Sequence, residues 1–165
     1  METLLRVDLS TIKEQTGGVL ELSEKLHLPS QGRVDFPEPV TVHVQVNRTN
    51  QGYYVSGKIH GRYQVPCDRC LEMIWEPLAA EFAENFYDRR SREREENDKI
   101  AGPEGIDLTP TLLEAITFAL PMKYLCRTDC RGLCSVCGKN RNLSGCSCSE
   151  QKNDPRLAVL AKWKK

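Results

Sequence analysis

The clearest hydrophobic pattern in the chain is a strict alternation of valine with polar residues over residues 40–47. Successive residues of a strand point to opposite faces, so the four valines fall on one face and the polar side chains on the other. Residues 50–52 predict a turn and residues 53–65 a returning strand, so the pair is expected to form a β-hairpin. Gly57 and Gly61 inside the second strand predict a bulge or a bend.

Weaker patterns predict further strands on both sides of this hairpin. An opening strand is expected over residues 3–9, and a second over residues 19–23 after a glycine turn. Residues 28–39 hold three prolines and are expected to form a loop or a sheet edge, because proline cannot donate to a ladder. Residues 71–75 resemble a strand, and residues 78–87 fit a strand or a short helix. We favour a strand there because the neighbouring elements are strands.

One helix is predicted over residues 109–121. Thr109 is expected to cap it, Pro110 suits its first position, and Pro121 limits its end. Its apolar side chains share one face, which should pack on the sheet: Leu112, Leu113, Ile116, Ala119 and Leu120. A second, short amphipathic helix is predicted after residues 154–155, where the same cap-then-proline pattern recurs.

These elements predict an α+β fold, an antiparallel β-sheet with one packed helix, followed by a small cysteine-rich segment and a short terminal helix. We expect a body over residues 1–121 and a basic metal-binding tail over residues 122–165 packed on it. Residues 88–99 hold four arginines, five acids and no apolar residue, which predicts an exposed, mobile loop within the body. The interleaved acids oppose a role for these arginines in RNA binding.

The composition fits a water-soluble protein of one domain, or of one domain with a small metal-stapled appendage. The chain has 165 residues, 39% hydrophobic and 28% charged, and no apolar run approaches the roughly 20 residues that span a bilayer. Residues 1–8 alternate in polarity and lack the basic and apolar regions of a signal peptide. A cytoplasmic location without membrane association is therefore expected.

The formal net charge of zero hides an asymmetry between the two parts. Residues 122–165 hold ten Lys or Arg and three acids, a net charge of +7, so residues 1–121 carry −7. A basic tail on an acidic body favours an anionic partner, most commonly RNA, although a solvated basic surface would have the same composition.

Eight cysteines supply the candidate chemistry, and six of them lie within residues 126–148. In a reducing compartment such clusters bind metal more often than they form disulfides, whereas four disulfides would be the alternative in a secreted protein. Cys134-x-x-Cys137-Gly138 has the spacing of a zinc knuckle, because two cysteines three apart can hold one metal from a tight turn. We favour two zinc sites, one of Cys134, Cys137, Cys146 and Cys148, the other of Cys67, Cys70, Cys126 and Cys130. Other partitions remain open, including one that leaves Cys126 as a spare thiol.

Enzyme chemistry has weaker support. Cys67-Asp-Arg-Cys70 could cycle between dithiol and disulfide, and Arg69 would favour a thiolate there. A thioredoxin-like motif, however, sits at a helix N-terminus in a βαβ unit, and here the motif follows a predicted strand. The three histidines are scattered, and phosphate loops and hydrolase motifs are missing. We therefore expect a protein that is not an enzyme and has no small-molecule substrate.

Taken together, several motifs resemble the YceD family, the large ribosomal RNA subunit accumulation proteins. They are Val65-Pro-Cys-Asp-Arg-Cys-Leu71, Ile106-Asp-Leu108 before a helix that ends in Leu-Pro, the cysteine run 125–138, Cys146-x-Cys148, and Asp154-Pro-Arg156. The resemblance covers the chain from the hairpin to its end. It implies a role in the accumulation of large-subunit ribosomal RNA and in ribosome assembly, in a bacterial or plastid setting.

The sequence thus leads to one favoured function and two alternatives. The favoured one is a non-enzymatic zinc-binding factor whose partner is ribosomal RNA or a pre-ribosomal particle. Its phosphate contacts are expected from four basic residues of the tail: Arg127, Arg131, Lys139 and Arg141. The alternatives are a zinc-stabilised protein–protein adaptor and a thiol oxidoreductase.

Overall fold

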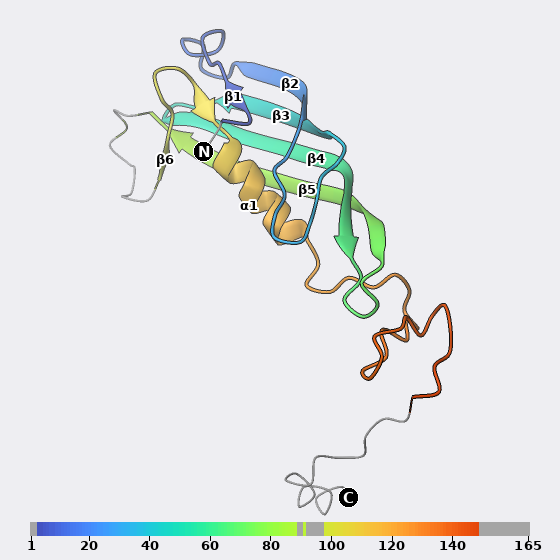
Figure 1. The fold of residues 1–165 in the computed structure, drawn as a ribbon. Helices are drawn as coiled ribbons and strands as arrows, with labels where there is room; N and C mark the ends of the chain where they lie inside the picture. The colour runs from blue at the N-terminus through green and yellow to red at the C-terminus, as the bar shows by residue number, and fades with distance from the viewer. Residues whose placement is uncertain (1–2, 89–90, 92–97, 149–165) are drawn as a thin grey trace, which may run out of the picture.

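A five-stranded sheet dominates the computed structural model, which describes residues 3–88, 91 and 98–148. The strand order is β2-β3-β4-β5-β6, and neighbouring strands are antiparallel except β6, which runs parallel to β5 (Figure 1). The strands are β2 Val19–Leu26, β3 Val40–Arg48, β4 Gly52–Pro66, β5 Met73–Tyr87 and β6 Lys99–Ile100. The α+β class is confirmed, with a sheet that is antiparallel except at its last, two-residue strand.

The predicted hairpin is the centre of this sheet. The valines of β3 are buried as the alternation required, with Val40 and Val46 0% exposed. Residues 73–75 and 78–87 of the two predicted segments lie in one continuous strand, β5, which pairs with β4 along its whole length, whereas residues 71 and 72 belong to the turn before it. Pro77 does not interrupt it, because proline is tolerated on an edge strand and only two residues of β6 pair with the other side of β5.

The bulge predicted at Gly57 and Gly61 is absent, since β4 pairs without a break with β5 at both glycines, and with β3 at Gly57. The two glycines instead make room for side chains across the sheet. A Cβ atom at Gly57 would lie 2.5 Å from the Phe82 ring, and one at Gly61 would lie 2.7 Å from Cγ1 of Val40. Both positions are therefore closed to larger residues by packing on the core face.

A second, two-stranded sheet joins the N-terminus to the start of the helix. It pairs β1 (Arg6–Val7) with β7 (Ile106–Asp107). The opening strand predicted over residues 3–9 is thus only two residues long. It ends where the Asp8 carboxylate accepts a hydrogen bond from the Ser10 backbone amide (2.8 Å) and so forms a turn.

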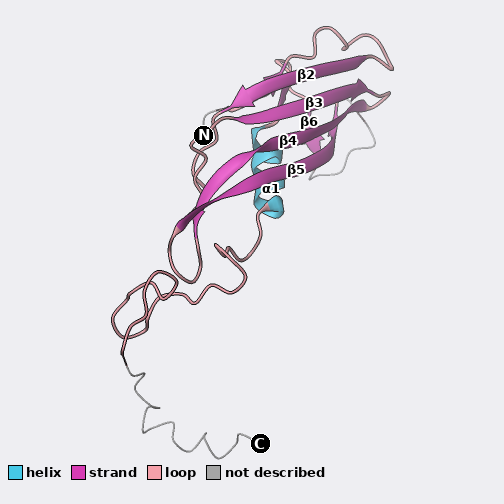
Figure 2. Ribbon diagram, turned by 90° about the vertical axis from the view of Figure 1, so that its right-hand side faces the viewer, coloured by secondary structure: helices cyan, strands magenta, loops and turns pink. Residues whose placement is uncertain are grey.

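The helix α1 spans Thr109–Ala119 and lies across one face of the sheet, where it packs on β5 (Figure 2). Its residues Leu112 and Ile116 are 1% and 0% exposed. Thr109 does not cap it, contrary to the prediction. The N-cap residue is Leu108, the Thr109 hydroxyl accepts from the Leu4 amide (2.8 Å), and Asp107 accepts from the Thr109 amide (2.9 Å). The threonine is used to hold the N-terminal segment against the helix.

The remaining described residues, 120–148, form no helix or strand and lie at the end of the sheet where β4 turns into β5 (Figure 1). Two predicted features lie outside the described residues. One is the terminal helix expected after residues 154–155, and the other is most of the charged loop, namely residues 89–90 and 92–97. The predicted loop was one residue too long at its end, because Lys99 is in β6, where its ammonium group lies 3.1 Å from both Glu84 and Thr111. Within the described part of the chain, no helix is long and apolar enough to cross a membrane.

Candidate metal centres

The cysteines gather into two groups of four, which could each hold one metal ion. In each group the four sulfur atoms all lie within 4.8 Å of one another. Centre 1 consists of Cys67, Cys70, Cys126 and Cys130, and centre 2 of Cys134, Cys137, Cys146 and Cys148. This is the division that the sequence favoured, and it leaves no cysteine over.

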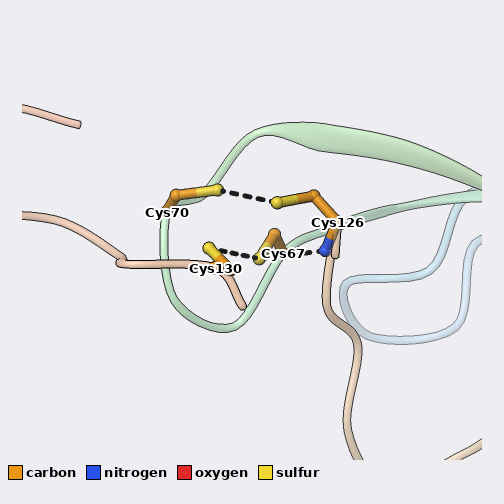
Figure 3. Close-up of side chains that lie close together, drawn as sticks. All are labelled: Cys67, Cys70, Cys126 and Cys130. Atoms are coloured by element: carbon orange, nitrogen blue, oxygen red, sulfur yellow. Dashed lines mark hydrogen bonds between the residues drawn. The ribbon is translucent and has the colours of Figure 1, made fainter. Parts of the chain in front are cut away.

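Centre 1 joins the sheet to the tail. Cys67 and Cys70 lie in the turn between β4 and β5, and Cys126 and Cys130 approach from the segment that follows α1 (Figure 3). The Cys67 and Cys130 sulfurs are 3.9 Å apart, and those of Cys70 and Cys126 are 3.6 Å apart. Three of the four residues are buried and Cys126 is half-buried. A metal here would bind together residues that are about 60 positions apart in the chain.

Centre 2 is local to the tail and more open. Cys134 is buried, Cys146 and Cys148 are half-buried, and Cys137 is exposed. The Cys134 amide donates to the Lys139 carbonyl (2.8 Å), which closes the loop around the first cysteine pair. All four ligands come from 15 consecutive residues, so a metal here would order the tail without tying it to the sheet.

The two cysteine pairs that are three residues apart share one turn geometry. In centre 2 the Gly138 amide donates to the Cys134 carbonyl (2.9 Å), and Gly138 has a φ of 70°. In centre 1 the Leu71 amide donates to the Cys67 carbonyl (3.0 Å), and Leu71 has a φ of 62°. The glycine of the sequence motif thus has the left-handed conformation expected of it, and a leucine is forced into the same conformation in centre 1.

Leu71→Gly is therefore expected to stabilise the protein. A left-handed conformation costs a non-glycine residue about 1 kcal/mol, and the Leu71 side chain is 62% exposed, so little packing is lost. The free energy of unfolding in urea should rise by about 0.5–1 kcal/mol. Leu71→Ala is the control, since it removes the side chain but keeps the strain, and it should give no such gain.

The thiols within each centre differ in pKa because their surroundings differ. Burial favours the neutral form of Cys67, but hydrogen bonds from the amides of Arg69, Cys126 and Cys70 outweigh it and lower its pKa to about 6. The amides of Cys137 and Val136 likewise lower the pKa of Cys134 to about 6.

The neighbouring thiols shift in the opposite direction. Burial, together with the hydrogen bond to Cys70, raises the pKa of Cys126 to about 12, and the contact with Cys137 raises that of Cys148 to about 12. Four negative charges cannot share one small volume without a counter-ion. A bound divalent cation that accepts thiolates would allow all four sulfurs of a centre to ionise.

A polar and aromatic cluster that the sequence reading missed supports centre 1. The Asp68 carboxylate accepts from the Tyr124 amide (2.7 Å) and pairs with Arg33. The centroids of the Tyr124 and Tyr63 rings lie 6.1 Å apart, with an angle of 79° between the ring planes. The Arg33 guanidinium lies 5.3 Å from the centroid of the Tyr124 ring. These contacts hold the tail on the sheet two residues before its first cysteine. Nothing in the spacing of these residues identified them, because they meet only in the fold.

Asn142 lies in the chain between Cys137 and Cys146 of centre 2, and its side chain contacts centre 1. Its amide nitrogen lies 3.2 Å from the Cys130 sulfur, and its carbonyl oxygen accepts from the Arg131 amide (2.8 Å). The same oxygen accepts from the Arg127 guanidinium (3.0 Å). A polar side chain that donates to a ligand sulfur stabilises the thiolate and fixes its position.

The four basic residues expected to contact phosphate lie in different surroundings. Arg131 and Lys139 are exposed. Arg127 is exposed and lies 3.3 Å from Asp129. Arg141 is half-buried and directs its guanidinium to the Cys134 sulfur at 3.8 Å, so it faces centre 2. Three of the four basic side chains are thus exposed to solvent, and the fourth, that of Arg141, is directed at a cysteine of centre 2.

The Cys67-x-x-Cys70 pair does not have the setting of a thioredoxin-like motif. It lies in a turn between two antiparallel strands, and no helix begins there. The sulfurs of Cys126 and Cys130 also lie within reach of both. The geometry suits metal ligation by four cysteines better than the cycling of one pair.

Comparison with known proteins agrees with the motifs. The sequence model of the family described as "Large ribosomal RNA subunit accumulation protein YceD" matches residues 55–164, about two thirds of the chain. An uncharacterized protein of Mycobacterium tuberculosis H37Rv is 27% identical over 81% of this chain and 69% of its own length. The uncharacterized protein YlbN of Bacillus subtilis is 29% identical over 63% of this chain and 62% of its own length.

One plant relative has a descriptive name. It is the chloroplastic "Large ribosomal RNA subunit accumulation protein YCED homolog 1" of Arabidopsis thaliana, 22% identical over 76% of this chain. The match covers 49% of that longer protein. No solved structure matches the chain. The family match spans the sheet from β4 onwards, the helix and both cysteine groups, and the chain therefore belongs to the YceD family of large ribosomal RNA subunit accumulation proteins.

Proposed function

We propose that the protein is a non-enzymatic, zinc-binding factor that supports the accumulation of large-subunit ribosomal RNA and the assembly of the ribosome. The observation that carries the proposal is the family match over residues 55–164, whose description names ribosomal RNA accumulation. In this proposal ribosomal RNA or a pre-ribosomal particle is the partner, and the metal centres are structural.

Zinc is the ion that suits both centres best. The donors are four thiolates in each, and tetrahedral sites of four cysteines are typical of zinc. Such sites are structural, because four protein ligands leave no coordination position for water or a substrate. When bound, zinc supplies no reaction here; its chemistry is to fix the four sulfurs and the loops that carry them.

The tail is the part of the chain best suited to meet RNA. Residues 122–148 hold five Lys or Arg and one acid, and both metal centres would hold these residues in fixed positions. Exposed Arg131 and Lys139 can each reach a phosphate, and each such contact releases a counter-ion from the nucleic acid. Arg127 can contribute once its contact with Asp129 opens, whereas Arg141 would support the tail through centre 2.

Charge reversal at Arg131 and Lys139 tests this proposal. The double variant R131E/K139E should bind purified large-subunit ribosomal RNA of the native host at least about tenfold more weakly at low salt. The slope of log K against log salt should fall by about two, one for each lost phosphate contact. Fluorescence anisotropy over a salt series measures both quantities.

A matched control carries the same charge change at the opposite end of the body. Arg6→Glu with Lys13→Glu also lowers the net charge by four, but neither residue is in the tail. The control should retain RNA binding to within about threefold if the contacts are local to the tail. Equal losses in both variants would mean that only net charge matters, and would contradict the assignment of the tail.

A protein partner is the second candidate. The tail exposes Val136 (58%) and Leu143 (80%), apolar side chains that suit contact with a protein better than contact with phosphate. Capture of the native protein on beads at low salt, with and without nuclease, separates the two. Ribosomal RNA that is released by nuclease supports the RNA proposal, and a nuclease-resistant complex without RNA supports the adaptor.

A further inference from the structure

Among the residues that the structure describes, none pairs with the outer edge of strand β2, at one side of the main sheet. It is the outermost strand of the order β2-β3-β4-β5-β6, and its eight residues all pair with β3 on the inner side (Figure 2). Most of its side chains are exposed, with Val19 at 52%. An open strand edge of this length is a template for pairing with another strand.

The register shows which backbone groups face the free edge. Arg48 donates its amide to Gly18 and accepts from Gly17, so even-numbered residues of β3 point their backbone groups toward β2. Their partners in β2, such as Leu20 opposite Val46 and Leu22 opposite Val44, point back toward β3. The amides and carbonyls of Val19, Glu21, Ser23 and Lys25 therefore face outward.

The side chains of β2 are self-complementary in one antiparallel register. With Ser23 opposite Ser23 of a second copy, Glu21 lies opposite Lys25 of that copy, and the two-fold axis repeats the pair. On the core side of the sheet, Leu20 lies opposite Leu26, and Leu22 lies opposite Glu24. A shift of two residues in one direction places Lys25 opposite Val19, and a shift in the other direction places Glu24 opposite Glu24.

The charged side chains of β2 are available for such a pairing. Glu21 and Lys25 are exposed, and their neighbours on β3 are the uncharged Gln45 and Thr41. Among the ion pairs of the described residues, neither Glu21 nor Lys25 takes part. Opposite charges directly across two strands stabilise the pair, and like charges there destabilise it.

We propose that β2 pairs with β2 of a second copy across a two-fold axis, with Glu21 opposite Lys25, so that the two sheets become one continuous sheet. The pairing adds about six backbone hydrogen bonds from the outward-facing residues Glu21, Ser23 and Lys25. It leaves the metal-binding tail, which lies at the end of the sheet beyond the β4–β5 turn, free on both copies (Figure 1). The proposal does not depend on the proposed function.

A charge reversal and its rescue test the pairing in the full-length chain. The wild type should have twice the 18.7 kDa chain mass in light scattering at high micromolar concentration, and should dissociate on dilution. Lys25→Glu places like charges opposite each other twice and should raise the dissociation constant by about tenfold or more. The double variant E21K/K25E exchanges the charges and should restore the wild-type constant to within about threefold.

Amide hydrogen exchange adds a second readout. The outward-facing amides of Glu21, Ser23 and Lys25 should exchange slowly in the dimer and rapidly in Lys25→Glu, while the inward-facing amide of Leu22 stays protected in both. A wild type that is monomeric at every concentration overturns the proposal. An unchanged dimer in Lys25→Glu, or a double variant that is folded by circular dichroism and remains monomeric, overturns it equally.

Discussion

Cys130→Ser is expected to halve the zinc content, from two ions per chain to one, and to lower the free energy of unfolding by about 4 kcal/mol. The variant loses a buried ligand of the centre that joins the β4–β5 turn to the tail. The sulfurs of Cys67, Cys70 and Cys126 then lack the fourth ligand of a closed site. If zinc bound at this centre requires the folded arrangement of its four cysteines, its loss should remove binding free energy from folding.

Cys146→Ser is the matched control, since it also removes one ligand of four. Its centre is local to the tail and half exposed, so one zinc should again be lost, but the unfolding of the sheet should change by about 1 kcal/mol or less. Elemental analysis and urea unfolding followed by far-UV circular dichroism measure the two effects. One zinc in the wild type, or equal destabilisation by both variants, would contradict the assigned roles of the two centres.

The sequence predicted those features that are set by neighbours along the chain. The alternating valines located β3, the turn after it located β4, and Pro110 with Pro121 bounded the helix. The division of the cysteines into two groups of four could also be predicted from the sequence, because short spacings such as Cys134-x-x-Cys137 constrain which cysteines can share a metal.

The predictions that failed depended on contacts with distant segments. Thr109 has the side chain of a helix cap, but its hydroxyl is taken by Leu4, over 100 residues earlier. Gly57 resembles a bulge residue in sequence, yet the space above it is filled by Phe82 of the next strand. The support of centre 1 by Arg33, Asp68 and Tyr124 was missed for the same reason.

Tyr124→Ala is expected to separate the contribution of this support from that of the metal. Tyr124 is 6% exposed and its ring packs against Tyr63, so truncation should cost about 3–5 kcal/mol of stability. The loss should also loosen centre 1, because the ring contacts with Tyr63 and Arg33 are removed two residues before Cys126 and only the backbone hydrogen bond to Asp68 remains there. Zinc transfer to a chromogenic chelator should be about tenfold faster for one ion and unchanged for the other.

Two further substitutions show whether packing is the cause. Tyr124→Phe keeps the ring and loses only the hydrogen bond of its hydroxyl with Tyr63, so it should cost about 1 kcal/mol of stability. The release rates of both zinc ions should stay as slow as in the wild type. Met122→Ala changes a side chain of the same segment that is fully exposed, and it should be neutral within about 0.5 kcal/mol. If Tyr124→Ala released zinc no faster than these two variants, the cysteines alone would hold the tail on the sheet. Faster release of one ion only would mean that zinc retention in centre 1 depends on the packing of the Tyr124 ring on the sheet as well as on the four cysteines.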